Sequence, residues 1–96
     1  MARHLPQESL SGNPQIRTLE DLGLTVRSAR ARGRLRIDDA AAFIGVSADM
    51  LSRLENGKPV TTDRLLKVLE GLGLEMLVVP KSQALRFRDA ALRDSE

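Results

Sequence analysis

The 96-residue sequence contains no cysteine, tryptophan or tyrosine, and only two phenylalanines, Phe43 and Phe87. Without cysteine the chain can form neither a disulfide nor a thiolate metal site, and this absence fits a reducing compartment. With so few aromatic side chains, Leu, Val, Ile and Ala must make the core, which favours small packed helices. A chain of this length buries a modest fraction of its surface, so its core should be marginally stable alone, which favours dimerisation.

Long apolar runs are also absent, because no stretch approaches the ~20 apolar residues that a membrane helix needs. Residues 1–15, MARHLPQESLSGNPQ, lack the apolar centre of a secretory signal. We therefore expect a cytoplasmic protein with no membrane partner.

Residues suited to catalysis or metal binding are few and badly placed. The single histidine, His4, lies in a polar segment with little periodicity. Asp38 and Asp39 are adjacent, so they point about 100° apart around a helix and cannot converge as a carboxylate pair. The sequence has neither a Gly-rich phosphate loop nor ligands at metal-binding spacing. We expect no enzyme activity, no metal and no cofactor.

The net charge of +2 is small, but it is unevenly distributed. The segment from Thr25 to Arg36 has no acid and carries five arginines, namely Arg27, Arg30, Arg32, Arg34 and Arg36. Such a basic segment indicates a surface for a polyanion. The alternative is a solvated helix end, because cations also suit a helix C-terminus.

The segment from Ile37 to Lys58 has the pattern of two short helices joined by a tight turn. Apolar residues recur at helical spacing in the first helix, which Gly45 ends. Ser47 is a natural N-cap for the second helix, which stops at Gly57. Two helices joined in this way form a helix-turn-helix, whose second helix can enter the DNA major groove. The outward positions of that second helix are Ala48, Asp49, Ser52, Arg53 and Asn56.

Further helices are predicted on both sides of this pair. Thr18 and Asp21 form a capping box at the start of a helix that continues to Gly33. Arg30 lies near the edge of its apolar stripe and is a candidate for an internal ion pair. A loop after the helix pair leads to Thr62, the predicted N-cap of a strongly apolar helix.

The end of the sequence divides into a candidate strand and a polar tail. Glu75–Pro80, EMLVVP, has the composition of a strand. A lone strand cannot satisfy its backbone, so its simplest partner is the same strand of a second copy, through Met76, Leu77, Val78 and Val79. Packing on the chain's own helices is the alternative. Residues 81–96 are predicted to be a mobile tail, and residues 1–17 a flexible arm. Phe87 is a candidate for docking a partner, and the alternative is a single exposed apolar side chain, which is common on protein surfaces.

The segment from Leu22 to Lys58 resembles the Xre-type helix-turn-helix of phage repressors in its LG…R…R start, its GVS turn and its ENGK close. The continuation GKPVTTDRLLKVLEGLGLEMLVV is similar to HipB-type antitoxins, which append one strand to the helical domain and dimerise through it. The resemblance implies a mostly α fold over residues 18–80. It would be a four- to five-helix repressor-like domain followed by one C-terminal β-strand, residues 75–80, that pairs across a dimer.

The resemblance also implies roles for individual residues. The recognition helix would be Ser47–Asn56, with base-reading positions at Ala48, Asp49, Ser52 and Arg53. Arg53 is the first choice, because arginine can bond guanine O6 and N7 together, while Asp49 would accept from cytosine N4 or orient Arg53. Contacts to DNA phosphates would come from Arg34, Arg36, Ser47, Asn56 and Lys58. Glu55 would pair with Arg30 and hold the recognition helix on the first helix.

The sequence departs from the family pattern at the start of the second helix. Family members have threonine or serine followed by a phosphate-binding glutamine, where this chain has Arg36 and Ile37. Arg34 and Arg36 would supply charge in a looser register. Asp38 and Asp39 suit the helix dipole but would repel a phosphate. These departures predict DNA binding that is weaker or altered.

The function implied by the resemblance is sequence-specific transcriptional repression at an inverted-repeat operator, bound by a homodimer with half-sites ~34 Å apart. The HipB-like continuation implies an antitoxin that represses its own operon and binds a HipA-like kinase toxin. Two alternatives stay open, a stand-alone phage-type repressor and a protein-interaction module that keeps the fold without binding DNA.

Overall fold

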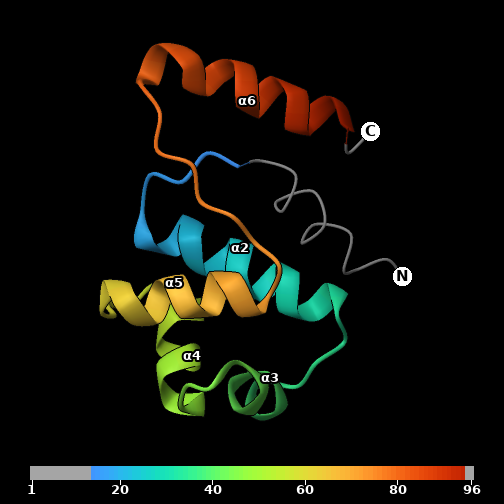
Figure 1. Ribbon diagram of the computed structural model, residues 1–96, viewed down its shortest axis with the longest axis vertical. Helices are drawn as coiled ribbons and strands as arrows, with labels where there is room; N and C mark the ends of the chain where they lie inside the picture. Colours follow the sequence, from blue (N-terminus) through green and yellow to red (C-terminus); the bar gives the residue numbers. More distant parts are fainter. Residues whose placement is uncertain (1–13, 95–96) are drawn as a thin grey trace.

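The computed structural model describes residues 14–94 and contains five helices over that range (Figure 1). They are α2 (Leu19–Arg32), α3 (Ile37–Ile44), α4 (Ala48–Glu55), α5 (Thr62–Gly71) and α6 (Lys81–Asp94). α4 packs against both α2 and α3, and α5 packs against α3. α6 lies beyond α2, at the end of the molecule remote from α3 and α4 (Figure 1). The prediction of a mostly helical protein is confirmed.

Local sequence signals set the helix starts. The Thr18 hydroxyl accepts a hydrogen bond from the Asp21 backbone N–H, and the Asp21 carboxylate accepts one from the Thr18 N–H, which completes the predicted capping box. The Ser47 hydroxyl accepts at 3.0 Å from a backbone N–H in the first turn of α4. At α5 the N-cap is Thr61, one residue before the predicted Thr62, because the extended backbone that precedes the helix ends at Thr61.

The tight turn between α3 and α4 depends on Gly45. Its φ of 94° lies in the left-handed region, where a side chain would be strained. The backbone N–H groups of Gly45 and Val46 both donate to the Ala41 carbonyl, at 2.8 Å and 3.0 Å. Residues 45–47 alone therefore join the two helices, as the pattern of the sequence predicts.

One apolar core joins α2, α3, α4 and α5. Its buried members are Val26, Ala40, Ala41, Ile44, Met50, Leu51, Leu54, Val68 and Leu69. Within each of these four helices they recur at helical spacing or share one side, so each helix turns a single apolar face to the core. Because α3 contributes two buried alanines, it meets its neighbours through small side chains. α4 buries only one of its faces in the core, and its other face stays accessible.

The predicted C-terminal strand is not formed in the single chain. Residues 74–80, which include Glu75–Pro80, have no regular secondary structure, and no strand occurs anywhere in residues 14–94. The physical reason is that a strand needs a hydrogen-bonded neighbour, and the described part of the chain offers none to this segment. Met76, Leu77 and Val78 are exposed, Val78 to 90%. Pairing across a dimer stays a prediction.

The predicted polar tail contains a helix. α6 begins directly after Pro80, whose carbonyl accepts hydrogen bonds from the N–H groups of Gln83 and Ala84. Its apolar side chains stay partly exposed, at 48% for Leu85 and 47% for Phe87. The helix was missed because its polar ends and exposed apolar groups are also typical of a tail. Of the predicted arm, residues 1–13 lie outside the described residues.

No helix within residues 14–94 has the length and apolar character that crossing a membrane requires. Nor does this range contain three or more His, Cys, Asp or Glu residues grouped closely enough to hold a metal ion.

Candidate nucleic-acid interface

The four residues predicted to read bases share the outer face of α4. Ala48, Asp49 and Arg53 are exposed and Ser52 is half-buried, whereas the leucines and the methionine on the opposite face are buried in the core. Burial of one face leaves the other to solvent along the whole helix. The structure therefore brings all four predicted residues together on one accessible surface.

Arg53 lies beside a groove between α4 and the start of α5. Its Nη2 donates to the Pro59 carbonyl at 3.1 Å, so the guanidinium is directed towards the loop that follows α4. The groove has a volume of about 580 Å³, and its polar lining consists of Ser47, Asp49, Arg53, Thr61 and Arg64. Among the described residues Asp49 forms no ion pair with Arg53, so Asp49 does not orient Arg53 here.

Sequence reasoning missed Thr61 and Arg64, which line the same groove. The available signal was the start of α5, because a helix N-terminus attracts anions. That terminus already carries an acid of its own. The Thr61 hydroxyl donates to the Asp63 carboxylate and lowers the pKa of Asp63 below its ordinary value, with the Arg64 backbone N–H as a second donor.

The five residues predicted to contact phosphates are all exposed, and three of them flank α4. Ser47 stands before its first residue, and Asn56 and Lys58 follow its last. Because a hydroxyl can accept and donate at once, the Ser47 hydroxyl can cap α4 and still donate to a phosphate. Arg34 and Arg36 stand apart from these three, in the loop between α2 and α3.

The start of α3 carries its own negative charge. The Asp38 carboxylate accepts a hydrogen bond from the Asp39 backbone N–H at 3.0 Å, and the Arg36 Nε lies 3.6 Å from the same carboxylate. The Asp38 carboxylate places negative charge at this helix end and so disfavours an approaching anion. Near the start of α3, the positive charge is therefore carried by the arginines of the preceding loop rather than by the helix end.

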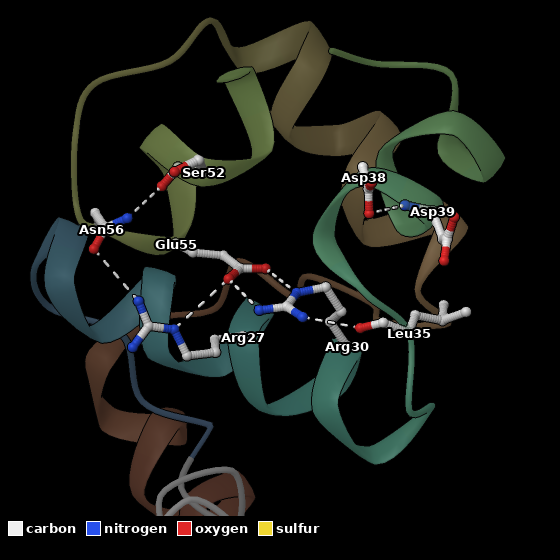
Figure 2. A network of polar contacts seen from close by, with 8 residues as sticks. All are labelled: Arg27, Arg30, Leu35, Asp38, Asp39, Ser52, Glu55 and Asn56. Carbon is white, nitrogen blue, oxygen red and sulfur yellow. Dashed lines mark hydrogen bonds and ion pairs between the residues drawn. The ribbon is translucent and has the colours of Figure 1, made fainter. Parts of the chain in front are cut away.

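α4 is held on α2 by Arg30 and Glu55 (Figure 2). Arg30 Nε donates to Glu55 Oε2 at 2.6 Å and Arg30 Nη2 to Oε1 at 2.8 Å. Arg30 Nη1 also donates to the Leu35 carbonyl at 2.9 Å. The bonds to Glu55 raise the pKa of Arg30 above its ordinary value. One guanidinium thus links α2, the end of α4 and the loop before α3.

A second arginine of α2, Arg27, approaches the same carboxylate (Figure 2). Its Nε lies 3.6 Å from Glu55 Oε1, and its Nη2 donates to Asn56 Oδ1 at 3.4 Å. Asn56 Nδ2 in turn donates to the Ser52 carbonyl at 2.8 Å. Sequence reasoning placed Arg27 in the basic segment but in no site, because Asn56 is 29 residues away along the chain.

Comparison with known proteins bears on this interface. A family model described as a helix-turn-helix domain matches residues 21–77, which include α3, α4 and α5. The chain is also 38% identical over 60 residues to a protein of Sinorhizobium fredii that is named an uncharacterized HTH-type transcriptional regulator, y4mF. The matched part covers 62% of this chain and 79% of that protein.

Proposed function

Because the chain belongs to the helix-turn-helix domain family and is a DNA-binding transcriptional regulator, we propose that it is a sequence-specific repressor. The observation that carries the proposal is the outer face of α4, where Ala48, Asp49, Ser52 and Arg53 are accessible together. A helix presented in this way fits the major groove, where base edges differ between all four base pairs.

In the proposed complex, contacts to bases and to phosphates have separate tasks. Arg53 would leave the Pro59 carbonyl and bind guanine O6 and N7, while Asp49 would accept from cytosine N4. Ser47, Asn56 and Lys58 would bind phosphates on either side of the groove and fix the register of α4. Arg34 and Arg36 would reach the backbone beside α3. Thr61 and Arg64 would extend this contact along the start of α5.

We propose further that the repressor is a homodimer on an inverted repeat. One such module binds DNA weakly, and joining two raises the effective concentration of the second. The segment through Met76, Leu77, Val78 and Val79 is open to a second copy, since it has no strand partner among residues 14–94. It leads away from α3 and α4 (Figure 1), so pairing there would leave both recognition helices free for half-sites ~34 Å apart.

The finer proposal is that this cytoplasmic repressor is an antitoxin without enzyme activity. The support is the resemblance of the sequence GKPVTTDRLLKVLEGLGLEMLVV to HipB-type antitoxins. The partner would be a HipA-like kinase toxin, and repression would act on the operon that encodes both proteins. Phe87 is the candidate docking residue, at 47% exposure on a helix remote from α4. Co-purification of the chain with the product of a neighbouring kinase gene tests this part.

Fluorescence anisotropy tests the repressor itself. The purified chain is titrated into DNA from upstream of its own gene and, separately, into a scrambled duplex of the same composition. We expect tight, sequence-dependent binding that saturates at two chains per site. Equal and weak binding to both duplexes would contradict the proposal and favour the protein-interaction module, for which the acidic start of α3 at Asp38 and Asp39 is the supporting observation.

A pair of variants tests the dimer. Val78→Asp places a charge in the exposed segment that the second copy would cover, whereas Leu66→Asp places the same charge on the exposed side of α5. We expect Val78→Asp to yield monomers and to weaken binding to the upstream DNA, and Leu66→Asp to leave both unchanged. Analytical ultracentrifugation reports the assembly state, and equal effects of the two variants would contradict pairing through residues 76–79.

A further inference from the structure

The charges around Glu55 do not balance. Its single carboxylate is buried, at 5% exposure, and faces two guanidinium groups from α2. Arg30 alone satisfies it through two short hydrogen bonds. Arg27 therefore adds a positive charge that the ion pair does not need, next to the end of the recognition helix.

Arg27 is also held differently from Arg30. The Arg27 side chain is 36% exposed against 18% for Arg30, and its contacts to Glu55 and Asn56 are long, at 3.6 Å and 3.4 Å. A guanidinium has five N–H donors in a planar fork. Within residues 14–94 the contacts of Arg27 engage only Nε and Nη2, which leaves Nη1 and its two hydrogens for another acceptor.

Asn56 provides a second donor beside it. Its Oδ1 accepts from Arg27 and its Nδ2 donates to the Ser52 carbonyl, so the orientation of the amide group is set on both sides (Figure 2). The amide nitrogen carries two hydrogens, and the Ser52 bond uses one. An exposed amide hydrogen and an exposed guanidinium edge thus lie next to each other, one from α4 and one from α2.

We propose that Arg27 and Asn56 form one phosphate-binding site that joins α2 to the C-terminal end of α4. The proposal rests on the proposed function in one respect, that the phosphate belongs to the DNA backbone. Arg27 supplies the charge and Asn56 the second hydrogen bond, and Arg30 keeps Glu55 from cancelling that charge. A phosphate bound there would fix α4 against α2 in the complex and would not distinguish one DNA sequence from another.

The test measures binding to a random-sequence duplex of about 20 base pairs by anisotropy, between ~50 and ~200 mM salt, because a phosphate contact acts on all sequences. The variants are Arg27→Ala, Asn56→Ala and the two combined. Arg86→Ala is the matched control, since it removes the same charge from an exposed position on the remote helix α6. Circular dichroism verifies folding, and Arg27→Gln replaces Arg27→Ala if alanine prevents it.

Each lost phosphate contact lowers the steepness of the plot of log affinity against log salt concentration (the salt slope) by about 0.9, which corresponds to about eightfold weaker binding near 0.1 M salt. We expect this loss for Arg27→Ala. Because the two residues share one phosphate, we expect the double variant to lose less affinity than the product of the two single losses. Arg86→Ala should change affinity less than twofold and leave the slope unchanged.

Two outcomes would overturn the proposal. Arg27→Ala could match Arg86→Ala in affinity and slope, which would leave Arg27 as a second, purely structural ion pair of Glu55. The wild-type chain could fail to bind the random duplex even at ~50 mM salt, which would remove the phosphate site and DNA binding together. If instead Arg27-dependent binding is present but the upstream DNA is not preferred, the site stands and only sequence-specific repression fails.

Discussion

Arg30 donates two hydrogen bonds to Glu55, at 2.6 Å and 2.8 Å, across the contact between α2 and α4. Removing one partner of a buried pair leaves a charge uncompensated, at a cost of about 3 to 5 kcal/mol. We expect Arg30→Ala to lower the free energy of unfolding by an amount near the lower end of that range, because Arg27 remains 3.6 Å from the carboxylate. Urea unfolding measures it.

The joint replacement Arg30→Met with Glu55→Leu is the control for this prediction. Because it removes both charges and keeps apolar volume, we expect it to be more stable than Arg30→Ala alone. A loss below about 1 kcal/mol in Arg30→Ala, the size typical of an exposed pair, would show that the ion pair contributes little to the fold.

Gly23 is the point where the backbones of α2 and α4 meet. A Cβ at this position would lie 2.6 Å from the carbonyl oxygens of both Leu54 and Glu55, so the two helices would have to separate. We expect Gly23→Ala to destabilise the protein by about 1 to 3 kcal/mol, although alanine favours helix. Thermal unfolding measures it, and an unchanged or raised melting temperature would contradict the close packing.

Arg34 has a φ of 58°, and among residues 14–94 no other residue except glycine has a positive φ. A side chain in this conformation costs roughly 1 to 2 kcal/mol. Glycine would remove this strain, but it would also make the unfolded chain more flexible, so only a part of that free energy is recovered. We expect Arg34→Gly to raise the melting temperature and to weaken DNA binding through a lost phosphate contact. Higher stability with unchanged affinity would exclude Arg34 from the interface.

Arg53 is the residue through which we expect a base to be recognised. Arg53→Ala should cost about 1 to 3 kcal/mol of binding free energy at a single base position of the operator. Arg53→Lys is the matched control, because lysine keeps the charge and loses the two-pronged guanine contact. Anisotropy against a set of singly substituted operators measures both, and equal weakening on every sequence would identify Arg53 as a phosphate contact.

Asp63 makes the stability of the folded protein depend on pH. The Thr61 hydroxyl holds the pKa of Asp63 below the value of about 3.9 expected in the unfolded chain. The stabilisation is therefore fully present above roughly pH 5 and is lost as the pH falls through the folded pKa. We expect the melting temperatures of the wild type and of Asp63→Asn to converge on acidification. A difference that is constant from neutral to acid pH would contradict this link.

Much of the domain could be predicted because its signals are local. The Thr18 capping box, the αL glycine Gly45 and the Ser47 cap each act within one helical turn, and each is found at the helix end that the sequence predicts. The end of the chain could not be predicted in the same way. Glu75–Pro80 has the composition of a strand, but no neighbouring segment within residues 14–94 pairs with it. The amphipathic pattern of α6 was too weak to distinguish a helix from a tail.

The sequence by itself determined the helices α2 to α5, the turn between α3 and α4 and the outward residues of α4, because periodicity and caps depend on neighbours in the chain. Only the tertiary structure decided which polar groups meet. Arg27 reaches Asn56, Arg53 turns to Pro59, and Thr61 and Arg64 join the groove beside α4. These contacts depend on how α2, α4 and α5 pack, since side chains far apart in the sequence come together only when the buried faces of the helices have met.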